Sequence, residues 1–164
     1  MAGFASQALA DESKAELTAN VQESKAAMIA KDPSLEALLA GAKGYVIFPK
    51  ITKAGLGIGG AAGTGQLFVG GAPVGEATMK QASIGFQAGG QQYAEAIVFQ
   101  DETALNNFKE GNFAFSAQAS AVALQTGASQ NAKFEDGVAV LTMAEKGLMA
   151  EAALGGQKFS FTPY

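Results

Sequence analysis

The segment that decides the fold lies in the first half of the chain, where residues 43–60 read KGYVIFPKITKAGLGIGG. An apolar run opens it and leads into Ala54–Gly75, a stretch of 22 residues that has no charge and contains nine glycines. A membrane-spanning helix is unfavourable here, because each interior glycine costs a helix about 1 kcal/mol. Glycine within strands instead permits bulges, sharp coiling and close backbone approach. The segment therefore predicts curved β-structure.

Alternation of apolar with polar or small residues predicts further strands, each with one buried face. The alternation occurs at residues 84–88, 113–119, 138–140 and 159–161. Turn signals lie between and beside these runs, at Gly70-Gly71, Gly89-Gly90, Glu135-Asp136-Gly137 and Gly155-Gly156. Their short spacing favours hairpins over crossover helices. We therefore expect a strongly curved, mainly antiparallel, barrel-like β-sheet.

Two helices are predicted before the sheet. Ser13 and Glu16 form a capping-box pattern, and the apolar residues that follow recur at helical spacing, which predicts a helix over about 11–31. Asp32 as N-cap, followed by proline at the first helical position, predicts a second, short helix that ends at Gly41.

A third helix is predicted as a short insertion from Asp101 to Glu110, because Asp101 can cap it and a glycine stops it. The expected fold class is α+β. No repeat or flexible linker divides the chain, so residues 11–164 are expected to form a single domain. Residues 1–10 end in an Ala-x-Ala pattern without a basic or long apolar region. We expect them to be disordered, or to be the remnant of a signal peptide or of an engineered chain end.

The composition excludes most catalytic and metal-binding chemistries. The 164 residues include no Cys and no His, and all 11 basic residues are lysine. Zinc and iron–sulfur sites, Ser-His-Asp and Cys-His nucleophiles and disulfides are thereby excluded. Without arginine the chain lacks the side chain best suited to bidentate contacts with phosphates or base edges, so nucleic-acid binding is not expected. We predict no enzyme activity, no catalytic residue, no metal and no cofactor.

Two motif-like features do not alter this prediction. Residues 55–60 fit the G-x-G-x-x-G string, with Glu76 at a suitable distance for a dinucleotide site. The following Ala61–Gly65 is too rich in glycine to open the helix that must meet the pyrophosphate. Glu76 or Glu95 together with Lys80 could in principle perform acid–base chemistry, but no carboxylate pair or nucleophile spacing supports it.

Positive charge is concentrated in the middle of the chain. The net charge is −4, yet residues 43–90 carry four lysines against one acid, and Gly41–Gly90 contains 14 of the 21 glycines. A basic, glycine-rich segment in an acidic protein indicates an anion-facing surface. Ammonium groups beside the N–H groups of exposed glycine loops would suit a phosphodiester. We therefore predict a lipid-headgroup site made by Lys43, Lys50, Lys53 and Lys80, with an ordinary solvated face as the open alternative.

The stretch at residues 43–60 resembles the opening signature of the SYLF domain family. Further matches follow in order, at Ala82–Gly90, Val98-Phe99, Ala117 with Ala119, Lys146–Ala150 and Leu154–Gly156. The resemblance covers about residues 12–158, which is nearly the whole chain.

The resemblance implies a β-rich domain with flanking helices, no catalytic activity, and peripheral binding to anionic phospholipid headgroups. The eukaryotic members bind phosphoinositides, and actin binding is also described for them. In bacteria such domains often stand alone as exported proteins or lipoproteins. The expected location is therefore the bacterial periplasm or the outer membrane, with the signal removed. A protein partner and the oligomeric state are left open.

Two other classes of protein are alternatives to a lipid-binding module. An outer-membrane barrel of about eight strands fits the length and the alternating aromatic residues at the end of the chain. The predicted helices and the shortage of Trp and Tyr count against it. The other alternative is a structural or protein-partner module of the cell envelope without lipid specificity, in which the glycine-rich strands serve only the fold.

Overall fold

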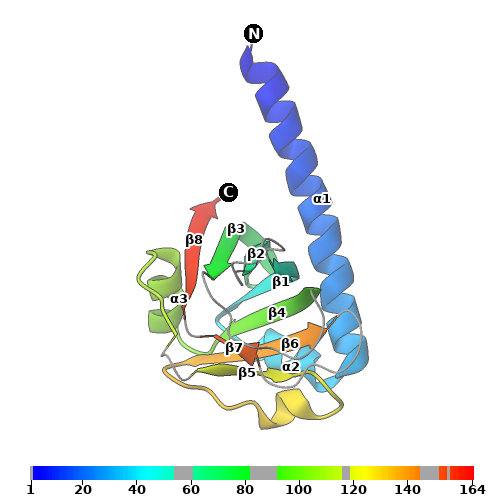
Figure 1. Cartoon of the computed structure of the whole chain (residues 1–164), viewed down its shortest axis with the longest axis vertical. Helices are drawn as coiled ribbons and strands as arrows, with labels where there is room; N and C mark the ends of the chain where they lie inside the picture. The colour runs from blue at the N-terminus through cyan, green and yellow to red at the C-terminus, as the bar shows by residue number, and fades with distance from the viewer. Residues whose placement is uncertain (1, 54–60, 82–91, 116–118, 145–151, 155) are drawn as a thin grey trace.

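The computed structural model describes residues 2–53, 61–81, 92–115, 119–144, 152–154 and 156–164 (Figure 1). The elements, in chain order, are α1 (Ala2–Lys31), α2 (Ser34–Gly41), β1 (Gly44–Lys53), β2 (Ala61–Val69), β3 (Ala72–Gln81), β4 (Gln92–Phe99), α3 (Glu102–Lys109), β5 (Ser120–Ala123), the 3-10 helix η1 (Ala128–Asn131), β6 (Val138–Ala144), β7 (Ala152–Ala153) and β8 (Gln157–Pro163). Helices flanking a mainly antiparallel sheet confirm the predicted α+β class.

The strands form one sheet in the order β7-β5-β6-β4-β1-β2-β3-β8. Every neighbouring pair is antiparallel except β5 with β6. β7 and β8 stand at the two ends of this order, although they are consecutive in the chain and only a short turn joins them. The sheet is therefore curled (Figure 1). The described ladders do not pair β7 with β8, so the curl does not close into a barrel.

Both faces of the sheet are covered, which gives the core two layers. On β1, Val46 and Phe48 belong to the layer that includes α3, and Tyr45 and Ile47 belong to the layer that includes α1 and α2. The helical members of these layers are Ala104, Leu105 and Phe108 on the α3 side and Val21, Met28, Leu35 and Leu39 on the α1 side. Burial on both faces explains why β1 reads as an unbroken apolar run rather than as an alternating strand.

Glycine within the strands has the predicted role of close backbone approach at Gly65. A Cβ at this position of β2 would overlap the carbonyl oxygen of Ile47 and press on the ring of Phe48. The β1–β2 register shifts between Ile47 and Thr52, so the two backbones approach each other where β1 bulges. Bulges increase the local twist of a sheet. The curvature at this bulge therefore depends on glycine at position 65.

The N-terminal helices differ from the prediction at their starts. α1 begins at Ala2 rather than near residue 11, and α2 begins at Ser34, so that Pro33 occupies the N-cap position without a side-chain cap. Whether residues 1–10 are a signal remnant stays a prediction.

Asp32 was predicted to be the N-cap of α2, and it instead joins three parts of the chain. Its buried carboxylate accepts hydrogen bonds from Ser34 N and Oγ, Gly127 N and Ser129 N at 2.6–3.2 Å. Burial acts to raise the pKa of Asp32, but the hydrogen bonds from Ser129, Ser34 and Gly127 outweigh it and lower the pKa to about 2. The prediction failed because the η1 partners come from almost 100 residues further along the chain.

α3 confirms its predicted signals. Asp101 is the N-cap, and its Oδ1 accepts a hydrogen bond from Ala104 N at 2.8 Å. Gly111 follows the helix with a φ of +79°, a conformation that suits glycine at a helix end.

We expect Asp101→Ala to lower the free energy of unfolding by about 1 kcal/mol, because the Ala104 N–H loses its partner. Urea unfolding at pH 7 measures the change. Asp101→Asn is the matched control, since asparagine caps about as well as aspartate. Equal losses in the two variants would show that the capping hydrogen bond is not what stabilises this end of α3.

The predicted strand over residues 113–119 is wrong where the structure describes it, because residues 113–115 and 119 form no strand and β5 begins at Ser120. Phe113 and Phe115 pack against each other with ring centroids 4.9 Å apart, and both contact Phe159. Their alternation therefore reflects a shared aromatic cluster rather than a ladder. Residues 116–118 and the predicted strand at 84–88 lie outside the described residues.

The strands predicted around residues 138–140 and 159–161 are confirmed as β6 and β8. The Gly70-Gly71 turn joins β2 to β3, and both glycines have positive φ. At the Glu135-Asp136-Gly137 turn, Glu135 and Val138 exchange backbone hydrogen bonds of 2.9 and 3.0 Å. Gly89-Gly90 lies outside the described residues.

Candidate functional site

The structure separates the four lysines of the predicted headgroup site. The backbone N–H of Lys43 donates to Phe99 O at 2.9 Å just before β1 begins. Lys50 lies near the other end of β1, seven residues later, which is roughly 20 Å along a strand. Both side chains are exposed. Lys43 and Lys50 therefore do not lie in one cluster.

Lys80 lies at the same end of the sheet as Lys50, beside a lysine that the sequence did not indicate. Ala62 is the register partner of both Thr52 and Lys80, and Lys80 is paired in turn with Lys158 of β8. Lys80 and Lys158 are both exposed and directly opposite each other. Like charges in this position repel, so a bound anion would relieve the repulsion.

Lys53 is the last residue of β1 and is paired with Ala61, which places its backbone at this same end. Its side chain lies outside the described part of the structure, as do the glycine-rich residues 54–60 and 82–91. The lysine end is the name used below for Lys50, Lys53, Lys80 and Lys158.

A cavity of about 310 Å³ lies beside Lys50, where α1 passes the ends of β1, β4 and β6. Its lining consists of Asn20, Glu23, Ser24, Ala27, Pro49, Lys50, Gln92, Tyr93, Ala94 and Met143. An amine, two amides and two hydroxyls among these side chains can donate hydrogen bonds. The volume lies at the lower end of the range of small-ligand sites, which begins at about 300 Å³. The cavity can therefore hold a group of headgroup size beside Lys50, with the carboxylate of Glu23 also in its wall.

Two other lysines have aromatic partners instead. The ammonium of Lys14 lies 3.9 Å from the ring centroid of Tyr164, and that of Lys25 lies 5.3 Å from the ring centroid of Tyr45. Such cation–π contacts hold part of α1 on the sheet.

A fully buried carboxyl, Glu95, lies on the α3 side of the sheet. Its Oε1 accepts a hydrogen bond from Gln157 Nε2 at 3.1 Å, which links β4 to β8 across the inside of the curl. Burial raises the pKa of Glu95 to about 7, although the hydrogen bond from Gln157 acts to lower it. Burial and the charge of Glu95 also raise the pKa of Tyr93.

Glu95 is placed to hold a proton inside the protein and not to act on a substrate. It is fully buried, whereas Lys80 is exposed, so the two do not form an acid–base pair. Among the described residues, Glu95 Oε2 and Thr142 Oγ1 have no hydrogen-bond partner, and their residues are register partners on β4 and β6.

The residues that the structure describes contain no group of three or more acidic, His or Cys side chains able to hold a metal ion. They also include no helix with the length and apolar character needed to cross a bilayer.

Comparison with known proteins identifies the family. The family model Ysc84, described as "Las17-binding protein actin regulator", matches residues 80–163, which is half of the chain. Beta cell expansion factor A of Aeromonas veronii is 27% identical over 138 residues, which cover 79% of this chain and 49% of that protein. The chain thus spans about half the length of this curated relative. Together with the α+β fold, the match confirms the resemblance, and the chain belongs to the Ysc84 (SYLF) family of non-catalytic binding domains.

Proposed function

We propose that this protein binds anionic phospholipid headgroups at a membrane surface, through the lysine end and without catalysis. The observation that carries the proposal is the exposed pair of Lys80 and Lys158, which lie directly opposite each other on β3 and β8. The cavity beside Lys50 adds hydrogen-bond donors at the same end. Phosphate oxygens are the ligands that such a group of donors favours.

The expected binding is weak and sensitive to salt. A lysine near an anionic surface contributes about 1 kcal/mol, and salt screens this attraction within about 8 Å at physiological ionic strength. Phosphoinositides, with extra phosphates, are part of the proposed ligand class. The proposed location is the bacterial periplasm or the outer-membrane surface.

Co-sedimentation with vesicles tests the proposal. We expect binding to vesicles that contain anionic glycerophospholipids or phosphoinositides, no binding to neutral vesicles, and weaker binding at physiological salt. The double variant Lys50→Gln, Lys80→Gln is expected to bind about 30-fold more weakly, because two contributions of about 1 kcal/mol are removed.

The matched control is Lys31→Gln, Lys109→Gln, which changes the net charge equally at exposed positions outside the lysine end. Equal weakening in both double variants would overturn the assignment of the lysine end, because only the total charge would then matter. No binding to any vesicle would overturn lipid binding itself.

Failure of lipid binding would favour the second candidate function, a structural or protein-partner module of the envelope. The observation in its favour is the description of the matching family as a Las17-binding actin regulator, which names a protein partner for that family. Pull-down with actin or an actin regulator would test it directly.

A further inference from the structure

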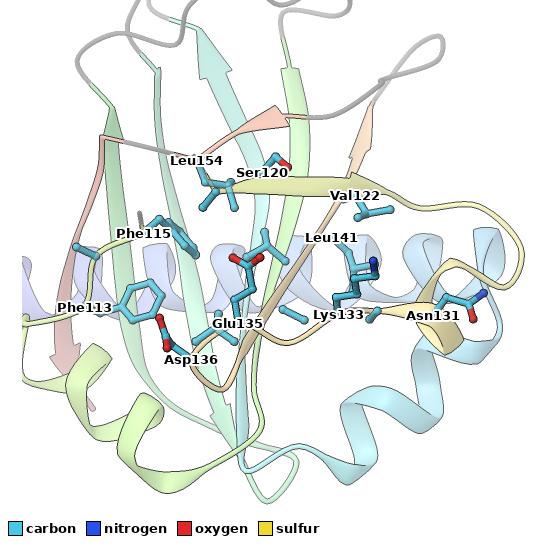
Figure 2. Close-up of a pocket in the computed structure, with 16 residues that line it drawn as sticks. Phe113, Phe115, Ser120, Val122, Asn131, Lys133, Glu135, Asp136, Leu141 and Leu154 are labelled. Carbon is cyan, nitrogen blue, oxygen red and sulfur yellow. The ribbon is translucent and has the colours of Figure 1, made fainter. Parts of the chain in front are cut away.

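A second and larger hollow lies on the other side of the curled sheet, along β5 and β6. Its volume is about 380 Å³, and Figure 2 shows the residues around it. Apolar side chains form most of its wall, namely Phe113, Phe115, Val122, Val138, Val140, Leu141 and Leu154. Val122 is 47% exposed, which is unusual for a large apolar side chain in this protein. The wall suits an alkyl chain, because burying apolar surface is favourable in proportion to its area.

Charged side chains of both signs stand at the rim. Lys133, Glu135 and Asp136 line the hollow from the segment that leads from η1 into β6. Figure 2 shows the carboxylate of Glu135 pointing into the hollow and the side chain of Asp136 beside Phe113. Within the described structure, Lys133 and Glu135 make no side-chain hydrogen bond or ion pair, so both are available to a ligand.

A tight turn holds the backbone of the two acidic residues. Glu135 and Val138 exchange two backbone hydrogen bonds, and Asp136 has a φ of +52° in the turn between them. The rim therefore has two carboxylates that project from this turn and the ammonium group of Lys133 nearby, around an apolar interior.

We propose that this hollow holds the alkyl chain of a zwitterionic phospholipid, with the headgroup phosphate near Lys133 and the headgroup ammonium near Glu135 and Asp136. A fatty acid would bring its carboxylate close to two carboxylates, and a simple alkylamine would leave Lys133 without a partner. A phosphoethanolamine or phosphocholine headgroup satisfies both signs of charge.

The inference rests on the proposed lipid binding but concerns a different site. The wall of the hollow comes mainly from β5, β6 and the segments beside them, and none of Lys50, Lys80 and Lys158 lines it. Variants can therefore separate the two sites.

Calorimetric titration with monomeric lysophosphatidylethanolamine tests the inference, with a fatty acid and lysophosphatidylglycerol of equal chain length as comparisons. We expect the zwitterionic ligand to bind at least tenfold more tightly than either anionic one. Val122→Trp, which fills the mouth from an exposed position, should weaken binding at least tenfold, and Lys133→Gln about tenfold. The exposed Gln125→Trp is the matched control and should bind as the parent does.

Equal affinity for the three ligands would overturn the inference, as would unchanged binding in a folded Val122→Trp variant with a parental urea midpoint. The Lys50→Gln, Lys80→Gln variant should keep full affinity for the monomeric ligand. If the protein binds lysolipid but no vesicles, only the proposed role of the lysine end is wrong. If it binds vesicles but no lysolipid, only the proposal for the hollow is wrong. Binding of lysolipid but of no intact phospholipid in vesicles would assign the hollow to free single-chain lipids.

Discussion

Glu95→Gln is expected to stabilise the protein by about 3 kcal/mol at pH 8. Burial raises the pKa of Glu95 from an ordinary 4.5 to about 7. Between these two values the folded protein holds a proton that the unfolded chain releases, so the free energy of unfolding falls as the pH rises, by about 1.4 kcal/mol per unit. The glutamine side chain has no charge to bury and still offers an oxygen to Gln157.

Urea unfolding at pH 4, 6 and 8 measures this effect. At pH 4 the two proteins should be equally stable, because Glu95 is then protonated in both the folded and the unfolded state. Their difference should grow as the pH rises towards 7 and stay constant above it. Glu110→Gln, at an exposed carboxylate, is the control and should show no such trend. Parallel stability curves for the parent and Glu95→Gln would show that Glu95 is not buried as described.

Asp32→Ala is expected to lower the free energy of unfolding by about 3 kcal/mol at pH 7. The buried carboxylate accepts four hydrogen bonds, and its removal leaves the N–H groups of Gly127 and Ser129 without this partner. Hydrogen bonds to charged groups contribute about 1.5–3 kcal/mol each, and a buried unpaired donor is costly.

The pH dependence has the opposite sign to that of Glu95. The pKa of Asp32 is lowered from 3.8 to about 2, so its contribution is fully present above pH 4 and is lost as the pH falls through 2. Asp32→Asn replaces one of the two carboxylate oxygens with an amide group. One acceptor remains, but a donor then faces Ser129 N or Gly127 N. We expect an intermediate loss in urea unfolding. No loss in either variant would contradict the role of Asp32 in joining α2 to η1.

Local signals in the sequence were enough to predict several elements of the fold. The start of α3 followed from Asp101, whose capping interaction spans three residues, and the turn at Gly70-Gly71 followed from two adjacent glycines. Alternation failed where tertiary packing produced the same pattern, as it did for Phe113 and Phe115 in the aromatic cluster. The α1 start was missed because small and polar residues before residue 11 carry no apolar stripe.

The candidate site was harder to predict from the sequence, because its residues are brought together by pairing between distant strands. Lys50 and Lys80 could be chosen from charge and glycine content alone. Lys158 could not, because its place opposite Lys80 follows from the β3–β8 register. Lys43 was grouped with Lys50 by proximity in sequence, but an extended strand moves them apart. The mixed charges of residues 133–136 gave no signal before the fold placed them around an apolar hollow.

The position of β8 also bears on how the chain folds as it is synthesised. The ribosome releases β3 well before its outer partner β8, because β4, α3, β5, β6 and β7 all lie between them in the chain. Until then the backbone groups along that side of β3 form an open edge of the kind that pairs with other chains. While β3 lacks β8, pairing of this edge with another chain competes with completion of the sheet.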